Sequence, residues 1–168
     1  MKLKLKYSGC VTILAVAACM ATSAGQPAYA QSNTGSAAIN GTWNLDIAKS
    51  DFGKTAPPKS LTMTLAGTQT SRMWTTNEVA ADGKSRTGSY TGAVDDRYYP
   101  ITGNPDGATF AYMKDGTFAV KDKSGKVVQT TTYALSADGN TMTLHNTYHM
   151  PDGDVTRVAV FRKEKQAE

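Results

Sequence analysis

The chain contains few residues of the types that cross-linked domains and metal sites require. Of its 168 residues only two are cysteines, Cys10 and Cys19, and only two are histidines. Since no cysteine follows Cys19, a domain formed by the rest of the chain has no disulfide and depends on its hydrophobic core. His145 and His149 are four residues apart, which on a strand separates them by about 13 Å. We therefore predict no metal site.

Motifs that indicate catalysis are also missing. The sequence has neither the G-x-S-x-G turn of a serine nucleophile nor the G-x-x-x-x-G-K loop that binds phosphates. Asp95 and Asp96 are adjacent, so on an extended chain they point to opposite faces and do not share a proton. We predict no catalytic residues and no cofactor, and we interpret the chain as a protein other than an enzyme.

The formal net charge of +4 comes mostly from the N-terminus. Lys2, Lys4 and Lys6 are the only charged residues among the first thirty, which leaves 15 basic and 14 acidic residues after them. A nearly neutral body gives no reason to expect a nucleic-acid partner or an acidic membrane surface as partner.

Residues 1–30 have the three parts of a secretory signal peptide. The lysines are followed by an apolar run from Cys10 to Ala21, and Ala28-Tyr29-Ala30 is a small-x-small cleavage site. The apolar run is too short to span a bilayer. This pattern predicts export to the periplasm or the medium, with no membrane span.

A second interpretation of the same segment remains open. The sequence Val16-Ala17-Ala18-Cys19 resembles a lipoprotein signal, in which the cysteine is lipidated after cleavage. The residues from Ala21 to Ala38 are small and polar enough to serve as a tether. In this alternative the domain is lipid-anchored in the cell envelope through Cys19.

The body of the chain has the two-residue period of β-strands. Apolar and polar residues alternate in 60–65, 117–122 and 141–148, and Asp-Gly pairs recur at the spacing of hairpin turns. One helical turn is expected within 47–52. The pattern predicts an all-β, antiparallel up-and-down barrel of roughly eight to ten strands, with a two-sheet sandwich as the alternative. We expect a linker at 31–40, the barrel at 41–163 and a tail at 164–168.

The motif Gly41-Thr42-Trp43 resembles the first-strand G-x-W of lipocalins and related calycin barrels, and the whole pattern looks like that of small secreted bacterial barrels. The resemblance implies that Trp43 plugs the closed end of the barrel. It also implies that a basic residue of the last strand lies across Trp43. Arg157 and Arg162 are the candidates, with Arg157 chosen as the barrel-closing residue.

The expected inward-facing residues suggest a function but leave two alternatives. One is a lumen that binds a small apolar or amphipathic molecule, with aromatic and methionine walls and tyrosine or arginine anchors. The candidate binding residues are Tyr98, Tyr99, Phe110, Tyr112, Tyr133, Met142, Tyr148 and Arg157. The other is a filled barrel that acts through surface contacts with proteins or as an inhibitor. In that case Trp74, or the loop at Pro57-Pro58, would form the contact patch.

The segment 95–112 is the densest in unusual residues. Pro100 cannot donate a ladder hydrogen bond, so its strand is expected at an edge, at a bulge or at a strand end. Because neighbouring strand residues face opposite ways, one of Tyr98 and Tyr99 should point into the barrel.

Overall fold

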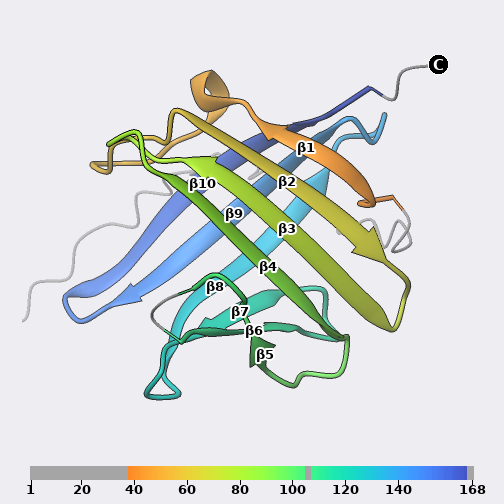
Figure 1. The fold of residues 1–168 in the computed structure, drawn as a ribbon, viewed down its shortest axis with the longest axis vertical. Coiled ribbons are helices and arrows are strands. Elements are labelled where there is room, and N and C mark those ends of the chain that lie inside the picture. Colours follow the sequence, from red (N-terminus) through yellow and green to blue (C-terminus); the bar gives the residue numbers. More distant parts are fainter. Residues whose placement is uncertain (1–37, 105–106, 166–168) are drawn as a thin grey trace, which may run out of the picture.

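The computed structural model describes residues 38–104 and 107–165, which form an antiparallel barrel (Figure 1). The predicted signal peptide, both cysteines, most of the predicted linker and the last three residues of the predicted tail lie outside the described residues. The elements are β1 Gly41–Leu45, the 3-10 helix η1 Ile47–Lys49, β2 Ser60–Gly67, β3 Ser71–Val79, β4 Ser85–Ala93, β5 Tyr99–Pro100, β6 Thr109–Tyr112, β7 Phe118–Lys121, β8 Val127–Leu135, β9 Thr141–Met150 and β10 Gly153–Lys163.

Strands that follow one another along the chain pair with each other, except β4 and β5, which lie at the two ends of the sheet order, and β1 also pairs with β10. In Figure 1, β1 to β4 form the near wall and β8 to β10 cross behind them. This order is that of a nearly closed up-and-down barrel with a calycin-like fold. The prediction of roughly eight to ten meandering strands is confirmed, and the two-sheet sandwich is excluded, because the ten strands form one sheet. The helical turn expected within 47–52 is η1.

The barrel closes along a short seam between β4 and β5. Here Ser89 of β4 and Thr102, two residues beyond β5, exchange two backbone hydrogen bonds, of 2.8 and 3.0 Å, and Val94, just past β4, forms a single bridge with Tyr112 of β6. β5 has only two residues and is the last strand in the sheet order, with Pro100 in it. The expectation that Pro100 marks an edge or a strand end is confirmed.

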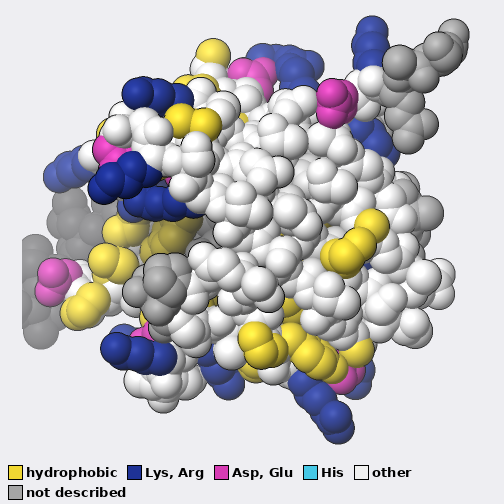
Figure 2. Space-filling model, viewed as in Figure 1, with side chains coloured by type: hydrophobic (Ala, Val, Ile, Leu, Met, Phe, Trp, Pro, Cys, Tyr) yellow, Lys and Arg dark blue, Asp and Glu magenta, His cyan; other side chains and the backbone are white. Residues whose placement is uncertain are grey.

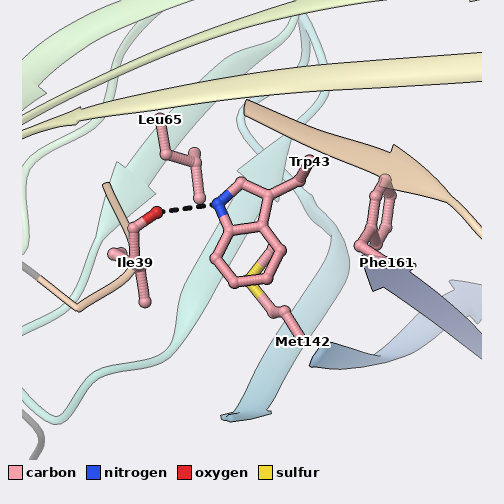
Figure 3. Close-up of a cluster of buried hydrophobic side chains, with 5 residues drawn as sticks. All are labelled: Ile39, Trp43, Leu65, Met142 and Phe161. Atoms are coloured by element: carbon pink, nitrogen blue, oxygen red, sulfur yellow. Dashed lines mark hydrogen bonds between the residues drawn. The ribbon is translucent and has the colours of Figure 1, made fainter. Parts of the chain in front are cut away.

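The closed end of the barrel is filled around Trp43 (Figure 3). The indole of Trp43 is fully buried and donates a 2.8 Å hydrogen bond from Nε1 to the Ile39 carbonyl. Leu65, Met142 and Phe161 pack around it. Because Trp43, Leu65 and Phe161 come from β1, β2 and β10, this cluster ties together the strands on both sides of the N-terminal strand.

A second cluster of aromatic rings fills the interior near the seam. Its buried members are Tyr90, Phe110 and Tyr112, with ring centroids 4.7 to 5.8 Å apart. Trp74 stacks on Tyr90 at 6.0 Å and also belongs to the Trp43 cluster, so it joins the two groups. Such ring pairs add stability beyond the area that they bury. The side of the barrel formed by β4 to β7 is therefore packed, not hollow.

Within 38–104 and 107–165, no helix has the length and apolar character needed to cross a bilayer.

The turns between strands use the expected chemistry. At Asp115-Gly116, for example, the aspartate accepts a 2.9 Å hydrogen bond from the Thr117 amide, and Gly116 has a φ of 85°.

Candidate functional site

A cavity of about 580 Å³ lies at the open end of the barrel, opposite Trp43. Apolar side chains from four strands form its inner wall, and the link between β1 and β2 covers one side. In Figure 2 hydrophobic side chains gather on the left, where this end of the molecule lies. The lining includes Leu45, Phe52, Thr55, Ala56, Pro58, Leu61, Glu78, Ala80, Ala81, Asp82, Arg86, Leu144, Asn146, Tyr148, Arg157, Val158, Ala159 and Phe161.

The link that covers the cavity is held against β10. Asp46 donates its amide to the Val160 carbonyl at 2.8 Å, and Asp51 and Val158 exchange hydrogen bonds of 2.7 and 3.0 Å. The Val160 amide donates to Ser50 Oγ at 2.9 Å. These contacts continue the ladder of β10 beyond the end of β1, so this side of the mouth has a fixed wall rather than a loose loop.

Asn146 and Arg157 form the polar part of the inner wall. They are direct partners across β9 and β10, and both face the interior. The Asn146 amide oxygen accepts two hydrogen bonds, from Thr131 Oγ1 at 2.8 Å and from Gln129 Nε2 at 3.1 Å. Asn146 is only 9% exposed, so these bonds fix the orientation of its side chain.

The guanidinium of Arg157 lies over the ring of Tyr148, with Cζ 4.6 Å from the ring centroid. Its Nε is buried and has no hydrogen-bond partner among the described residues. The ion pairs formed within the described residues do not include Arg157. Arg157 therefore brings a positive charge to the inner wall without a direct ion-pair partner, while the carboxylates of Glu78 and Asp82 lie on the opposite rim of the cavity.

The rim on the opposite side carries charges of both signs. Glu78 and Arg86 are direct partners across β3 and β4, and both also line a second hollow of about 540 Å³ next to the seam. At the β3–β4 turn, Asp82 pairs with Lys84 at 3.3 Å. The hydrogen bond from the Lys84 amide holds the pKa of Asp82 below its ordinary value, so this carboxylate stays ionised.

The eight predicted binding residues separate into two groups. Tyr148 and Arg157 line the cavity. Tyr98 points away from the interior, with Lys121 Nζ 4.0 Å above its ring. The other five pack in the two interior clusters instead of lining the cavity. Alternation along a strand predicts which side chains face inward, but it does not predict whether neighbouring side chains leave space beside them. These five residues are Tyr99, Phe110, Tyr112, Tyr133 and Met142.

Tyr99 is the one of the two adjacent tyrosines that faces inward. Its ring packs on Tyr90, and its hydroxyl donates a 2.9 Å hydrogen bond to Asp95. Burial raises the pKa of Tyr90 to about 12 and also raises the pKa of Tyr112. These tyrosines are neutral at neutral pH and act as packing residues.

The basic residue next to Trp43 differs from the prediction. Lys163 Nζ lies 5.3 Å from the centroid of the Trp43 ring and donates to the Ala38 carbonyl at 3.2 Å. Arg157 lies six residues away on β10, at the opposite end of the barrel, and Arg162 points outward to pair with Asp46 at 2.9 Å. Lys163 lies directly opposite Trp43 in the ladder, which is why it takes this position.

The proposed surface patch at Trp74 is not present, because Trp74 packs inside the barrel. Its neighbour Met73 faces outward and is 47% exposed. Pro58 lines the cavity. The surface-contact alternative is thus left with less apolar surface than the sequence suggested.

The histidines lie on the outer face of β9. His149 contacts Asp154 at 3.0 Å and Thr130 at 3.3 Å. Among residues 38–104 and 107–165, no three His, Cys, Asp or Glu side chains are placed to hold a metal ion.

Sequence reasoning missed Asn146, Glu78 and Arg86 as lining residues. Asn146 has the same parity as Leu144 and Tyr148, so the alternation that identified the strand also placed this amide inside. Polar residues at inward positions were the signal that could have found the site.

No protein-family model matches the sequence, and a search of curated proteins found no match. Among solved structures, lobster apocrustacyanin A1 is similar over 83% of this chain and 68% of its own, with 14% sequence identity and a TM-score of 0.43. A similarity at this level carries no argument about family or function.

Proposed function

We propose that this chain is an exported binding protein that holds one small amphipathic molecule in the cavity at the open end of its barrel. The observation that carries the proposal is the cavity of about 580 Å³. Sites for small molecules typically measure about 300–1,000 Å³ and combine apolar walls with a few polar groups. Leu45, Leu61, Leu144 and Phe161 supply the apolar wall, and Arg157 and Tyr148 supply the polar groups.

The division of the interior limits what the cavity can hold. The Trp43 cluster fills the closed end, and the aromatic cluster around Tyr90 fills the side next to the seam. A ligand therefore lies between the β1–β2 link and strands β9 and β10. Burial of its apolar part contributes about 25 cal/mol per Å² removed from water.

The test replaces a small lining residue with a large one, so that the new side chain occupies the cavity. Ala159 lies between Arg157 and Phe161 on the inner face of β10, and we expect Ala159→Phe to abolish binding of the neutral apolar dye Nile red. Thr156→Phe places the same side chain on the exposed outer face of the same strand, and binding should be unchanged. Equal binding by both variants would show that the dye binds elsewhere and would contradict the proposal.

Export is supported by the lysines, the apolar run and the Ala-Tyr-Ala site of residues 1–30. In a bacterial host the mature protein should begin at Gln31 and appear in the periplasm or the medium. If instead Cys19 is lipidated, the protein should sediment with membranes, and Cys19→Ala should release it. A chain that keeps Met1 and stays in the cytoplasm would exclude both routes.

A further inference from the structure

We propose that the ligand carries an anionic head group that only accepts hydrogen bonds, such as a carboxylate, and that Asn146 and Arg157 bind it. This inference rests on the proposed binding function and names the chemistry of the ligand. It begins from the pairing of the two residues. Asn146 and Arg157 stand directly opposite each other on β9 and β10 and line the same cavity. Side chains at such positions start about 5 Å apart, so both reach one bound group.

After the hydrogen bonds within the wall are counted, Asn146 and Arg157 have hydrogen-bond donors that remain unused, but neither has an unused acceptor. The Asn146 oxygen is used by Thr131 and Gln129, while its NH₂ group donates to none of the described residues. Arg157 has only donors, and its Nε is buried without a partner there. Donors that are shielded from water without acceptors cost free energy, and a carboxylate is the group that satisfies several at once.

The two donors are held in place before a ligand arrives. Asn146 is nearly buried, and its oxygen is fixed by two hydrogen bonds. The Arg157 guanidinium is held over the Tyr148 ring at 4.6 Å. Because little side-chain freedom remains to be lost on binding, the pair is suited to recognise an anion rather than to serve as a flexible surface charge.

The order of residues along β9 also orients the ligand. From the closed end outward the inward-facing residues are Met142, Leu144, Asn146 and Tyr148. The polar pair is therefore nearer the mouth, and the apolar wall of Leu144, Ala159 and Phe161 lies deeper. On β10 the lining extends from Arg157 to Phe161, which is about 13 Å along the strand, and Met142 beyond Leu144 belongs to the packed Trp43 cluster. An unbranched chain pointing inward, with its carboxylate at the mouth, matches this arrangement.

The experiment displaces bound Nile red with dodecanoate or with dodecanol, which have the same chain and different head groups. We expect dodecanoate to bind the unaltered protein about 10- to 100-fold more tightly than dodecanol, the range that one charge-assisted contact gives. Arg157→Gln should remove this preference and leave dodecanol binding within about threefold. Arg162→Gln, which changes an outward-facing arginine of the same strand, should keep the preference.

A second variant keeps the proposal testable if Arg157→Gln folds poorly. Asn146→Asp keeps an oxygen for Thr131 and Gln129 but replaces the NH₂ donor with a second carboxylate oxygen next to Arg157. We expect this variant to lose the preference for dodecanoate, to keep dodecanol binding, and to melt no lower than the unaltered protein, because Arg157 gains an acceptor.

The outcomes separate this inference from the proposed function. Equal displacement of the dye by dodecanoate and dodecanol, or an unchanged preference in Asn146→Asp, would overturn the anion site while the cavity proposal stands. Absence of Nile red binding in the unaltered protein, or dye binding that Ala159→Phe leaves intact, would overturn the cavity proposal and the anion site with it.

Discussion

The ring of Tyr90 occupies the space that a side chain at Gly92 would need. A Cβ atom added to Gly92 would overlap the Tyr90 hydroxyl oxygen and would lie 2.6 Å from Tyr90 Cζ and 2.7 Å from Tyr99 Cδ2. Gly92 and Tyr90 both face the interior of β4, and the tyrosine extends along the strand over the glycine. The aromatic cluster thus depends on the absence of a side chain at position 92.

We expect Gly92→Ala to destabilise the protein by about 1–3 kcal/mol, the usual cost of overpacking a core. Gly88→Ala is the matched control on the same face of β4, because its Cβ would meet Thr76 Oγ1 at 3.3 Å and only a ring carbon of Trp74 at 3.6 Å. Urea unfolding followed by circular dichroism measures both. A larger loss from Gly88→Ala than from Gly92→Ala would contradict the packing described above.

Two methionines of β9 test where the core lies. Met142 is 1% exposed in the Trp43 cluster, and Met150 is 55% exposed at the other end of the same strand. Met142→Ala leaves a cavity and should cost about 2–5 kcal/mol, whereas Met150→Ala should change the free energy of unfolding by less than about 0.5 kcal/mol. Similar thermal shifts for the two variants would count against a core centred on Trp43.

Buried tyrosines should make the protein sensitive to alkali. Burial raises the pKa of Tyr90 from 10.0 to about 12, and it raises the pKa of Tyr112 as well. Between about pH 10 and 12 the unfolded chain has lost these protons while the folded chain keeps them, so stability falls as the pH rises through this range. Each such group contributes a slope of up to about 1.4 kcal/mol per pH unit.

The measurement is urea unfolding at a series of pH values, together with tyrosinate absorbance. Tyr90→Phe should reduce the alkaline slope, and its stability at pH 7 should be nearly unchanged, because the Tyr90 hydroxyl has no hydrogen-bond partner among the described residues. The Tyr112 amide lies close enough to lower the pKa of Tyr90, although it does not reach hydrogen-bond geometry with this oxygen. A slope identical to that of the unaltered protein would contradict the burial of this ring.

The local pattern predicted most of the fold. Alternation in 60–65 and 141–148 identified strands and the faces of Leu65 and Met142, and the Asp-Gly pairs identified hairpin turns. These features depend on neighbouring residues only, since the strand period and the turn geometry are local properties of the backbone. Tyr90 was missed as a core residue because it is the one large apolar residue of a strand that otherwise contains Ser, Thr, Gly, Arg and Ala.

The candidate site was predicted in part. Tyr148 and Arg157 were named as anchors and line the cavity, whereas Met142, Phe110 and Tyr112 share their inward parity and pack in clusters. The alternation of residues along a strand cannot distinguish a side chain that lines a cavity from one that packs in the core. That difference depends on which strands curve toward one another. Lys163, not Arg157, lies beside Trp43 for the same reason: the pairing register of β1 and β10 joins residues more than a hundred positions apart.

By itself the sequence determined the strand class, the order of the turns and the inward or outward direction of most side chains, because these follow from the two-residue period and from turn chemistry. Only the tertiary structure decided that Asn146 and Arg157 meet with donors and no acceptor, that Tyr90 needs Gly92, and where the interior stays hollow. Those relationships depend on how distant strands are paired and closed into a barrel, and no local pattern of residues contains that information.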